Sequence, residues 1–148
     1  MAERRGLEAD HDAPLDRDLR LLRRIPPRRV KVDHPSQPPN SDCFKPPRNS
    51  RGTSVDIWTE GYDPLETIRR AESELPEGEE WGLVYFTVGD VLDLGLAVEP
   101  KPLPDNPQHA LIVGNFNKTI LRKLATKAAD GWIQKPVPIS STRPGRNE

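Results

Sequence analysis

His34 and His109 are the side chains of this sequence best suited to acid–base chemistry. An imidazole gives or takes a proton near neutral pH, as a general acid or base must do. His109 precedes the apolar run ALIV, so we expect it at the end of a buried strand, where substrate groups often gather. His34 lies in the turn-forming segment DHPSQPPNSD. Both are candidate catalytic residues, although for His109 a structural position at the edge of the core is the favoured interpretation and catalysis the alternative.

Arginine and lysine side chains form a second group, because they bind phosphate oxygens through charge-assisted hydrogen bonds. The densest cluster lies at residues 20–31, and a second basic face is expected on a helix at 117–129. The candidate binding residues are Arg20, Arg24, Arg28, Arg29, Lys118 and Arg122. No aromatic residue lies between Met1 and Asp42, so stacking of nucleic-acid bases by the first cluster is not expected.

The segment GNFNKT, from Gly114 to Thr119, follows an apolar strand and opens a helix, which is the setting of a phosphate-binding loop. It has no glycine directly before Lys118, and the interval from Gly114 to Lys118 is shorter than that motif requires. We therefore exclude a P-loop NTPase and expect Asn117 to be the N-cap of the helix. A simple anion site at the helix start is the alternative.

Cys43 is the single cysteine, so the chain has no internal disulfide. Next to Phe44, it is expected to be a small buried apolar residue, and a reactive thiolate stabilised by neighbouring basic side chains is the alternative. The other metal-ligating side chains, His11, His34 and His109, are far apart and form no paired-ligand pattern with it. No metal site and no cofactor are therefore predicted.

The net charge of −1 conceals a segregation of charge along the chain. Residues 1–51 carry twelve basic and eight acidic side chains, and residues 101–148 carry eight and three. Between them, residues 52–100 carry two basic and twelve acidic side chains. Mutual neutralisation within the fold is the simplest interpretation, because a nucleic-acid-binding domain is normally basic overall. A charged partner surface is the alternative.

The elements that must position these side chains follow from apolar spacing and from helix and turn signals. A short helix is predicted over 14–24, because Leu15, Leu19 and Leu22 form one stripe that ends before Pro26-Pro27. Strands are predicted at 30–32, 54–59, 81–86, 96–98 and 109–113, with 132–133 at a sheet edge. Further helices are predicted at 64–75, with Asp63 as N-cap, at 117–129, and after the capping box Thr87-Val-Gly-Asp90.

Ile25 to Gly52 is a long irregular segment that holds seven of the seventeen prolines. A connection of this length is commonly a binding loop, an active-site loop or a disordered segment. We expect it to dock electrostatically onto the acidic residues 52–100. Its proline pairs could instead present an extended ligand to an aromatic groove.

Together these patterns predict an α+β fold: one small domain at 14–135, with a mixed or antiparallel sheet of about 4–5 strands and 3–4 short helices. Polar disordered tails are expected at 1–13 and 136–148. No apolar run approaches the length of about 18 residues that a membrane span needs, and no segment resembles a signal peptide. We therefore expect a cytoplasmic protein with no membrane contact.

The function predicted first is a small accessory module that binds another protein through the proline-rich loop at 33–51 and the basic faces at 17–31 and 118–127. The alternative is an enzyme or effector that acts on a nucleotide or nucleic acid, with His34 and His109 as acid–base groups beside a basic rim. Plain nucleic-acid binding is a third possibility. Whether the protein is an enzyme stays open at this level.

Overall fold

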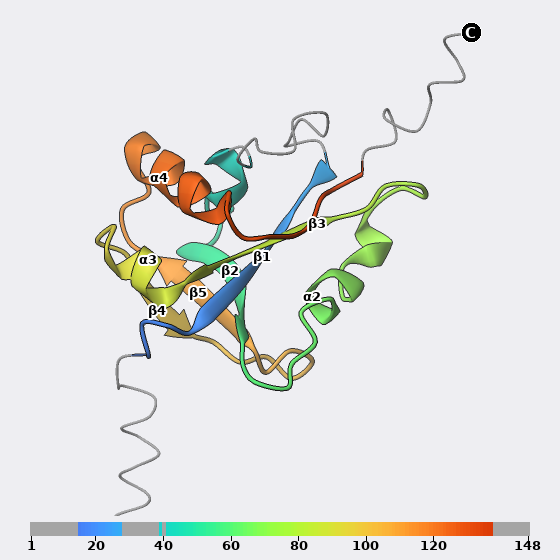
Figure 1. Cartoon of the computed structure of the whole chain (residues 1–148), viewed down its shortest axis with the longest axis horizontal. Coiled ribbons are helices and arrows are strands. Elements are labelled where there is room, and N and C mark those ends of the chain that lie inside the picture. Colours follow the sequence, from blue (N-terminus) through green and yellow to red (C-terminus); the bar gives the residue numbers. More distant parts are fainter. Residues whose placement is uncertain (1–14, 28–38, 40, 138–148) are drawn as a thin grey trace, which may run out of the picture.

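Six strands pair into one open antiparallel sheet in the order β4-β5-β2-β1-β3-β6 (Figure 1). The computed structural model describes residues 15–27, 39 and 41–137. Its elements are β1 (Arg20–Ile25), the 3-10 turn η2 (Ser41–Phe44), β2 (Gly52–Trp58), α2 (Glu66–Arg69), the 3-10 turn η3 (Glu72–Glu74), β3 (Gly82–Thr87), α3 (Val88–Leu92), β4 (Ala97–Pro100), β5 (His109–Val113), α4 (Lys118–Ala128) and β6 (Trp132–Gln134). The predicted α+β class is confirmed, but the sheet has more strands than the 4–5 expected.

The additional strand is β1, and the helix predicted over 14–24 is wrong. β1 lies at the centre of the sheet, antiparallel to β2 on one side and to β3 on the other. Leu15 and Leu19 pack on the α4 face of the sheet, whereas Leu22 packs on the α2 face. The helical stripe is therefore divided between two cores. Tertiary pairing on both sides of β1 overrides the local periodicity.

The remaining strands follow the predicted pattern closely, and β6 lies at the edge of the sheet. The capping box that opens α3 is present, because the Thr87 side chain accepts from the Asp90 amide and the Asp90 carboxylate accepts from the Thr87 amide. Asn117 is the N-cap of α4 and accepts from the amide of Ile120 at 2.8 Å. These short-range predictions are confirmed because each depends on side chains three residues apart.

The helix predicted over 64–75 is correct only in part. It consists of α2, which begins at Glu66, and the separate turn η3. Asp63 is not the N-cap; its carboxylate accepts from the amide of Leu65. The Trp81 indole donates to the carbonyl of Ala71 at 2.8 Å, at the point where the helix is interrupted. The Ala71 carbonyl also accepts from the amide of Glu74 at 2.9 Å, so the indole adds a tertiary hydrogen bond to a carbonyl already engaged in the 3-10 turn.

The two faces of the sheet carry separate apolar clusters, and helices lie over both faces (Figure 1). On one face, α3, α4 and η2 cover the larger core around Leu21, Phe44 and Phe86. On the other face, α2 covers the smaller cluster formed by Leu22, Ile68 and Leu83. Because α2 has only four residues, it leaves part of this second face to half-buried aromatic and polar side chains. The candidate site lies on this less covered face.

The second half of the long irregular segment is anchored in the larger core. Cys43 and Phe44 of η2 are buried, and the Phe44 ring meets Phe86 edge-on with centroids 5.9 Å apart. Arg23 donates to the carbonyl of Cys43 at 2.9 Å, and Thr53 donates to that of Phe44 at 2.6 Å. The interpretation of Cys43 as a buried apolar residue is confirmed. Residues 28–38 and 40, which include the strand predicted at 30–32, lie outside the described residues.

Ion pairs join the basic outer segments to the acidic middle of the chain. Arg17 pairs with Asp93 at 2.8 Å, and Lys127 pairs with Asp90 at 3.6 Å. Arg51, from the end of the irregular segment, pairs with Glu99 of β4. These contacts support charge neutralisation within the fold. The side chains are substantially exposed, so each pair adds little to stability.

The predicted tails fall mainly at the ends that the structure does not describe. Residues 1–14 and 138–148 lie outside the described residues, so the tail at 1–13 and most of that at 136–148 are among them. Val137 still exchanges backbone hydrogen bonds with Glu80, at 2.8 and 2.9 Å. Across the described ranges, no helix has the length and apolar character needed to cross a bilayer.

Candidate functional site

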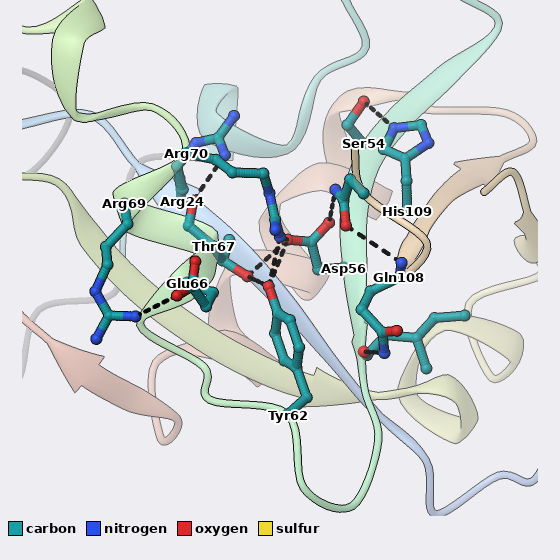
Figure 2. Close-up of polar contacts among 12 residues, drawn as sticks. Arg24, Ser54, Asp56, Tyr62, Glu66, Thr67, Arg69, Arg70, Gln108 and His109 are labelled. Carbon is teal, nitrogen blue, oxygen red and sulfur yellow. Dashed lines mark hydrogen bonds and ion pairs between the residues drawn. The ribbon is translucent and has the colours of Figure 1, made fainter. Parts of the chain in front are cut away.

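A pocket of about 330 Å³ opens on the α2 face of the sheet, between α2 and the connection from β4 to β5. Its size falls in the range of small-molecule sites, roughly 300–1,000 Å³. The polar part of the lining includes Arg24, Ser54, Asp56, Arg70, Asn106 and His109. Arg70 reaches Asp56 from the α2 side, whereas Ser54 and His109 lie on β2 and β5 on its other side (Figure 2).

Asp56 is the buried anchor of this pocket, with 4% of its surface exposed. One carboxylate oxygen accepts from the Thr67 hydroxyl at 2.6 Å and from the Arg70 guanidinium at 2.7 Å, and the other accepts from the Asn106 amide at 2.8 Å (Figure 2). Burial alone raises the pKa of Asp56, but these hydrogen bonds and the Arg70 charge outweigh it and hold the pKa below its ordinary value. Asp56 is therefore ionised, and its charge is compensated.

The alternation of β2 explains why a carboxylate occupies this position. Val55 and Ile57 point into the larger core, so Asp56 points to the α2 face. The partners of Asp56 come from segments distant in sequence. Thr67 and Arg70 belong to the α2 region, and Asn106 lies in a turn closed by reciprocal backbone bonds of 3.0 Å with Leu103. The network thus fastens α2 and the 103–106 turn to the centre of the sheet.

His109 is directly opposite Asp56 in the β2–β5 ladder, and both of its ring nitrogens are engaged. Nδ1 lies 2.9 Å from the carbonyl oxygen of Lys101, and Nε2 lies 3.1 Å from the Ser54 hydroxyl. A carbonyl oxygen only accepts, so Nδ1 carries the proton in the neutral ring. Nε2 is then the acceptor, and the Ser54 hydroxyl donates to it. This is the relation of a hydroxyl group to a general base.

Two arginines of β1, Arg23 and Arg24, line the pocket, and both donate to backbone carbonyls. Arg23 is enclosed between η2 and β2, where it donates to the carbonyls of Cys43 and Ser54. Loss of water lowers the pKa of Arg23 to about 10, so it stays a cation at neutral pH and supports the fold. Arg24 donates to the carbonyl of Thr67 at 2.9 Å, and its guanidinium lies 5.3 Å from the centre of the Trp81 ring. Arg24 makes one such hydrogen bond where Arg23 makes two, so Arg24 keeps more of its N–H donors for the pocket.

The predicted site residues lie in different parts of the structure, and only some of them line the pocket. Arg24 and His109 line the same pocket. Arg20 lies on the same face of the sheet, outside the pocket lining. Lys118 and Arg122 are exposed on α4, which covers the opposite face. Arg28, Arg29 and His34 lie outside the described residues, so the predicted meeting of the two histidines stays a prediction.

Four residues of the pocket are not among the site residues predicted from sequence: Ser54, Asp56, Arg70 and Asn106. For Asp56 the sequence contains one signal, which is an acidic residue inside a strand of regularly alternating polar and apolar positions. If such a residue is buried, it needs hydrogen-bonding or charged partners, and these define a polar site. Asn106 stands in the turn-forming run PDNPQ and resembles an ordinary turn residue. Its contact with Asp56 spans fifty residues of sequence, so local pattern does not reveal it.

A second feature of this face is the Arg20 cluster, formed by Arg20, Trp58 and Tyr85. The Arg20 guanidinium lies 3.8 Å from the centre of the Trp58 ring and 5.8 Å from that of Tyr85. The two rings meet edge-on with centroids 5.7 Å apart. Strand pairing therefore places aromatic rings beside an arginine whose own sequence segment has none.

The pocket can offer a guanidinium to an anion and a hydroxyl–imidazole pair to an electrophile. Among residues 15–27, 39 and 41–137, no group of three or more His, Cys, Asp or Glu side chains is arranged to hold a metal ion. Comparisons of the chain with protein-family models, with curated proteins and with solved structures find no match.

Proposed function

We propose that the pocket beside α2 binds a small phosphate-bearing ligand of the nucleotide class, with Arg24 as its principal cation. The observation that carries this proposal is that the Arg24 guanidinium has no carboxylate partner within the described residues. It lines the pocket and donates to a neutral backbone carbonyl. Arg70, by contrast, is compensated by Asp56. Arg24 therefore retains both charge and N–H donors for an anion.

Phosphate is the anion class that suits this arrangement. A planar guanidinium can bind two phosphate oxygens at once, and partial exclusion of water strengthens the contact. Asp56 does not repel an anion strongly, because Thr67, Asn106 and Arg70 already compensate its charge. Glu74 and Asp105 also line the pocket, but both are exposed, so solvent and salt screen them.

Substitution of Arg24 by glutamine is expected to raise the Kd for AMP about tenfold, the effect of losing one charge-assisted hydrogen bond. Isothermal titration with AMP and with inorganic phosphate measures the change. Arg122→Gln is the matched control, because Arg122 is an exposed arginine on α4 and should leave both affinities unchanged. Equal affinities of the wild-type and Arg24→Gln proteins, or no binding of either probe, would contradict the proposal.

A second candidate is the protein-binding module, and the Arg20 cluster favours it. Tryptophan, tyrosine and arginine are the residues most enriched at interface positions that dominate binding energy. Here all three meet on the less covered face of the sheet, with the rings half-buried and Arg20 exposed. Exposed Arg20 could contact a partner while Trp58 and Tyr85 keep its guanidinium in place.

Arg20→Ala is expected to weaken binding of such a partner by about 2 kcal/mol, roughly thirtyfold in Kd, as for a central interface arginine. Affinity capture from an extract of the source cells, with wild-type and variant protein compared by quantitative mass spectrometry, identifies the partner. Titration of that partner then measures the affinity. Lys101→Ala serves as the control, because Lys101 is exposed and lies outside the segments predicted to bind a partner. Recovery of the same proteins in the same amounts by Arg20→Ala would exclude this surface.

A further inference from the structure

We propose that Ser54 and His109 form a nucleophile–base pair that hydrolyses a carboxylic ester, with the ester carried by the phosphate-bearing ligand of the pocket. The identity of the ligand rests on the proposed function above, whereas the reactive pair rests on its own geometry. Ser54 and His109 both line the pocket, and their reacting atoms are 3.1 Å apart. That separation is within hydrogen-bond reach of a base for its nucleophile.

The orientation of His109 favours this role. The Lys101 carbonyl accepts from Nδ1 at 2.9 Å, which keeps the proton on that nitrogen and leaves Nε2 as the basic atom facing Ser54. A third group that orients the base is the feature shared by hydrolytic triads. Here a backbone carbonyl occupies the position that a carboxylate takes in such triads. The β4–β5 pairing holds this carbonyl, because the Lys101 amide also bonds to the His109 carbonyl at 2.9 Å.

Charges around the pair suit the changes in the reaction. Asp56 is the cross-strand neighbour of His109, but Thr67, Asn106 and Arg70 already compensate its charge, so it neither repels the ligand nor contributes strongly to the imidazolium that forms when His109 takes a proton. Arg24 lines the same pocket and has N–H donors beyond the one that Thr67 receives. Such donors can stabilise the oxyanion of a tetrahedral intermediate or the phosphate of the ligand.

The reaction proceeds in two balanced steps. Ser54 Oγ attacks the ester carbonyl and transfers its proton to His109 Nε2. The bond from the carbonyl carbon to the alkoxy oxygen then breaks, the alcohol leaves with the proton from Nε2, and the acyl group remains on Ser54. In the second step His109 takes a proton from water, the resulting hydroxide attacks the acyl carbon, and the proton returns to Ser54 Oγ as the carboxylic acid departs.

Acetylation by 4-nitrophenyl acetate tests the pair in the full chain. We expect a burst of nitrophenolate close to one equivalent per chain, and one acetyl group on the peptide that contains Ser54. Ser54→Ala should abolish the adduct, and His109→Gln should slow its formation by at least about a hundredfold, the contribution typical of a general base. Ser73→Ala, which removes an exposed serine on η3, is the control and should acetylate like wild type.

The outcomes separate this inference from the proposed function. A purely structural Ser54–His109 bond between β2 and β5 predicts no burst and no adduct at Ser54, and this result would overturn the inference even if AMP binds. An adduct formed equally fast in His109→Gln would overturn it as well. An adduct that depends on both residues, in a protein that binds neither AMP nor phosphate, would support the reactive pair and reject the phosphate-bearing ligand. Near-ultraviolet circular dichroism of each variant confirms that the tested chains are folded.

Discussion

Replacing Phe44 with alanine is expected to lower the free energy of unfolding by about 4 kcal/mol, within the range for a large-to-small change at a buried aromatic. The Phe44 side chain is fully buried, and its ring packs edge-on against Phe86 under α4. Its loss removes apolar contact and leaves a cavity that the surrounding strands can fill only partly. Urea unfolding followed by tryptophan fluorescence measures the change.

Arg51→Ala is the informative control for Phe44→Ala, because Arg51 joins the same irregular segment to β4 through an exposed ion pair with Glu99. We expect this variant to keep the wild-type urea midpoint, since exposed pairs are weak and screened by salt. The comparison asks what holds the segment on the sheet. A large loss in Arg51→Ala together with a small loss in Phe44→Ala would show that electrostatic docking dominates, against our expectation.

Asp56→Asn is expected to cost about 3 kcal/mol of stability at neutral pH, near the lower end for breaking a buried ion pair. The lower end applies because the Arg70 side chain keeps 25% of its surface exposed, so water partly compensates its charge. The asparagine side chain also places an NH₂ group next to the donors of Thr67, Arg70 and Asn106, which in the wild-type protein face only the acceptor oxygens of Asp56. Urea unfolding at pH 7 measures the loss, with Asp105→Asn, an exposed carboxylate of the same pocket, as the control.

The cost of Asp56→Asn should also depend on pH in a defined direction. The pKa of Asp56 is lower in the folded protein than in the unfolded chain, where a carboxyl of this type titrates at about 3.9. The folded state therefore binds fewer protons in this range, so the contribution of Asp56 is fully present above pH of about 4 and is lost as the pH falls through the folded pKa. The stability difference between wild type and variant should shrink below about pH 4. A difference that stays constant through this range would contradict the ionised state of Asp56.

The elements predicted correctly are those defined by contacts close in sequence. The capping box at Thr87–Asp90 and the N-cap at Asn117 depend on side chains that reach amides three residues away. The continuous apolar run of β5 needed no partner to be identified as a strand. β1 was misassigned because Leu15, Leu19 and Leu22 recur at helical spacing, although the structure places them on two faces of the sheet. In the structure, Arg23 and Arg24 donate hydrogen bonds to backbone carbonyl oxygens. The Arg20 guanidinium lies over the Trp58 ring.

In the candidate site, too, single residues could be predicted from the sequence, but their arrangement in space could not. His109 was accessible to sequence reasoning, because it borders an apolar strand, and Arg24 belonged to an evident basic cluster. Their position in one pocket was not accessible, since it depends on the strand order that puts β5, β2 and β1 side by side. Ser54 becomes a candidate only through the pairing of β2 with β5. This pairing places Ser54 Oγ 3.1 Å from Nε2 of His109, which is 55 residues away in the sequence.

Local sequence is sufficient for the α+β class, for the N-terminal ends of α3 and α4, for the apolar strands and for the burial of Cys43 beside Phe44. These properties depend on hydrophobic periodicity and on hydrogen bonds within one turn, which neighbouring residues decide. The central position of β1, the interruption between α2 and η3, and the network around Asp56 come from tertiary structure alone. Each depends on a polar group whose partner is supplied by another element, and the free energy of burying such a group is settled only when that partner is in place.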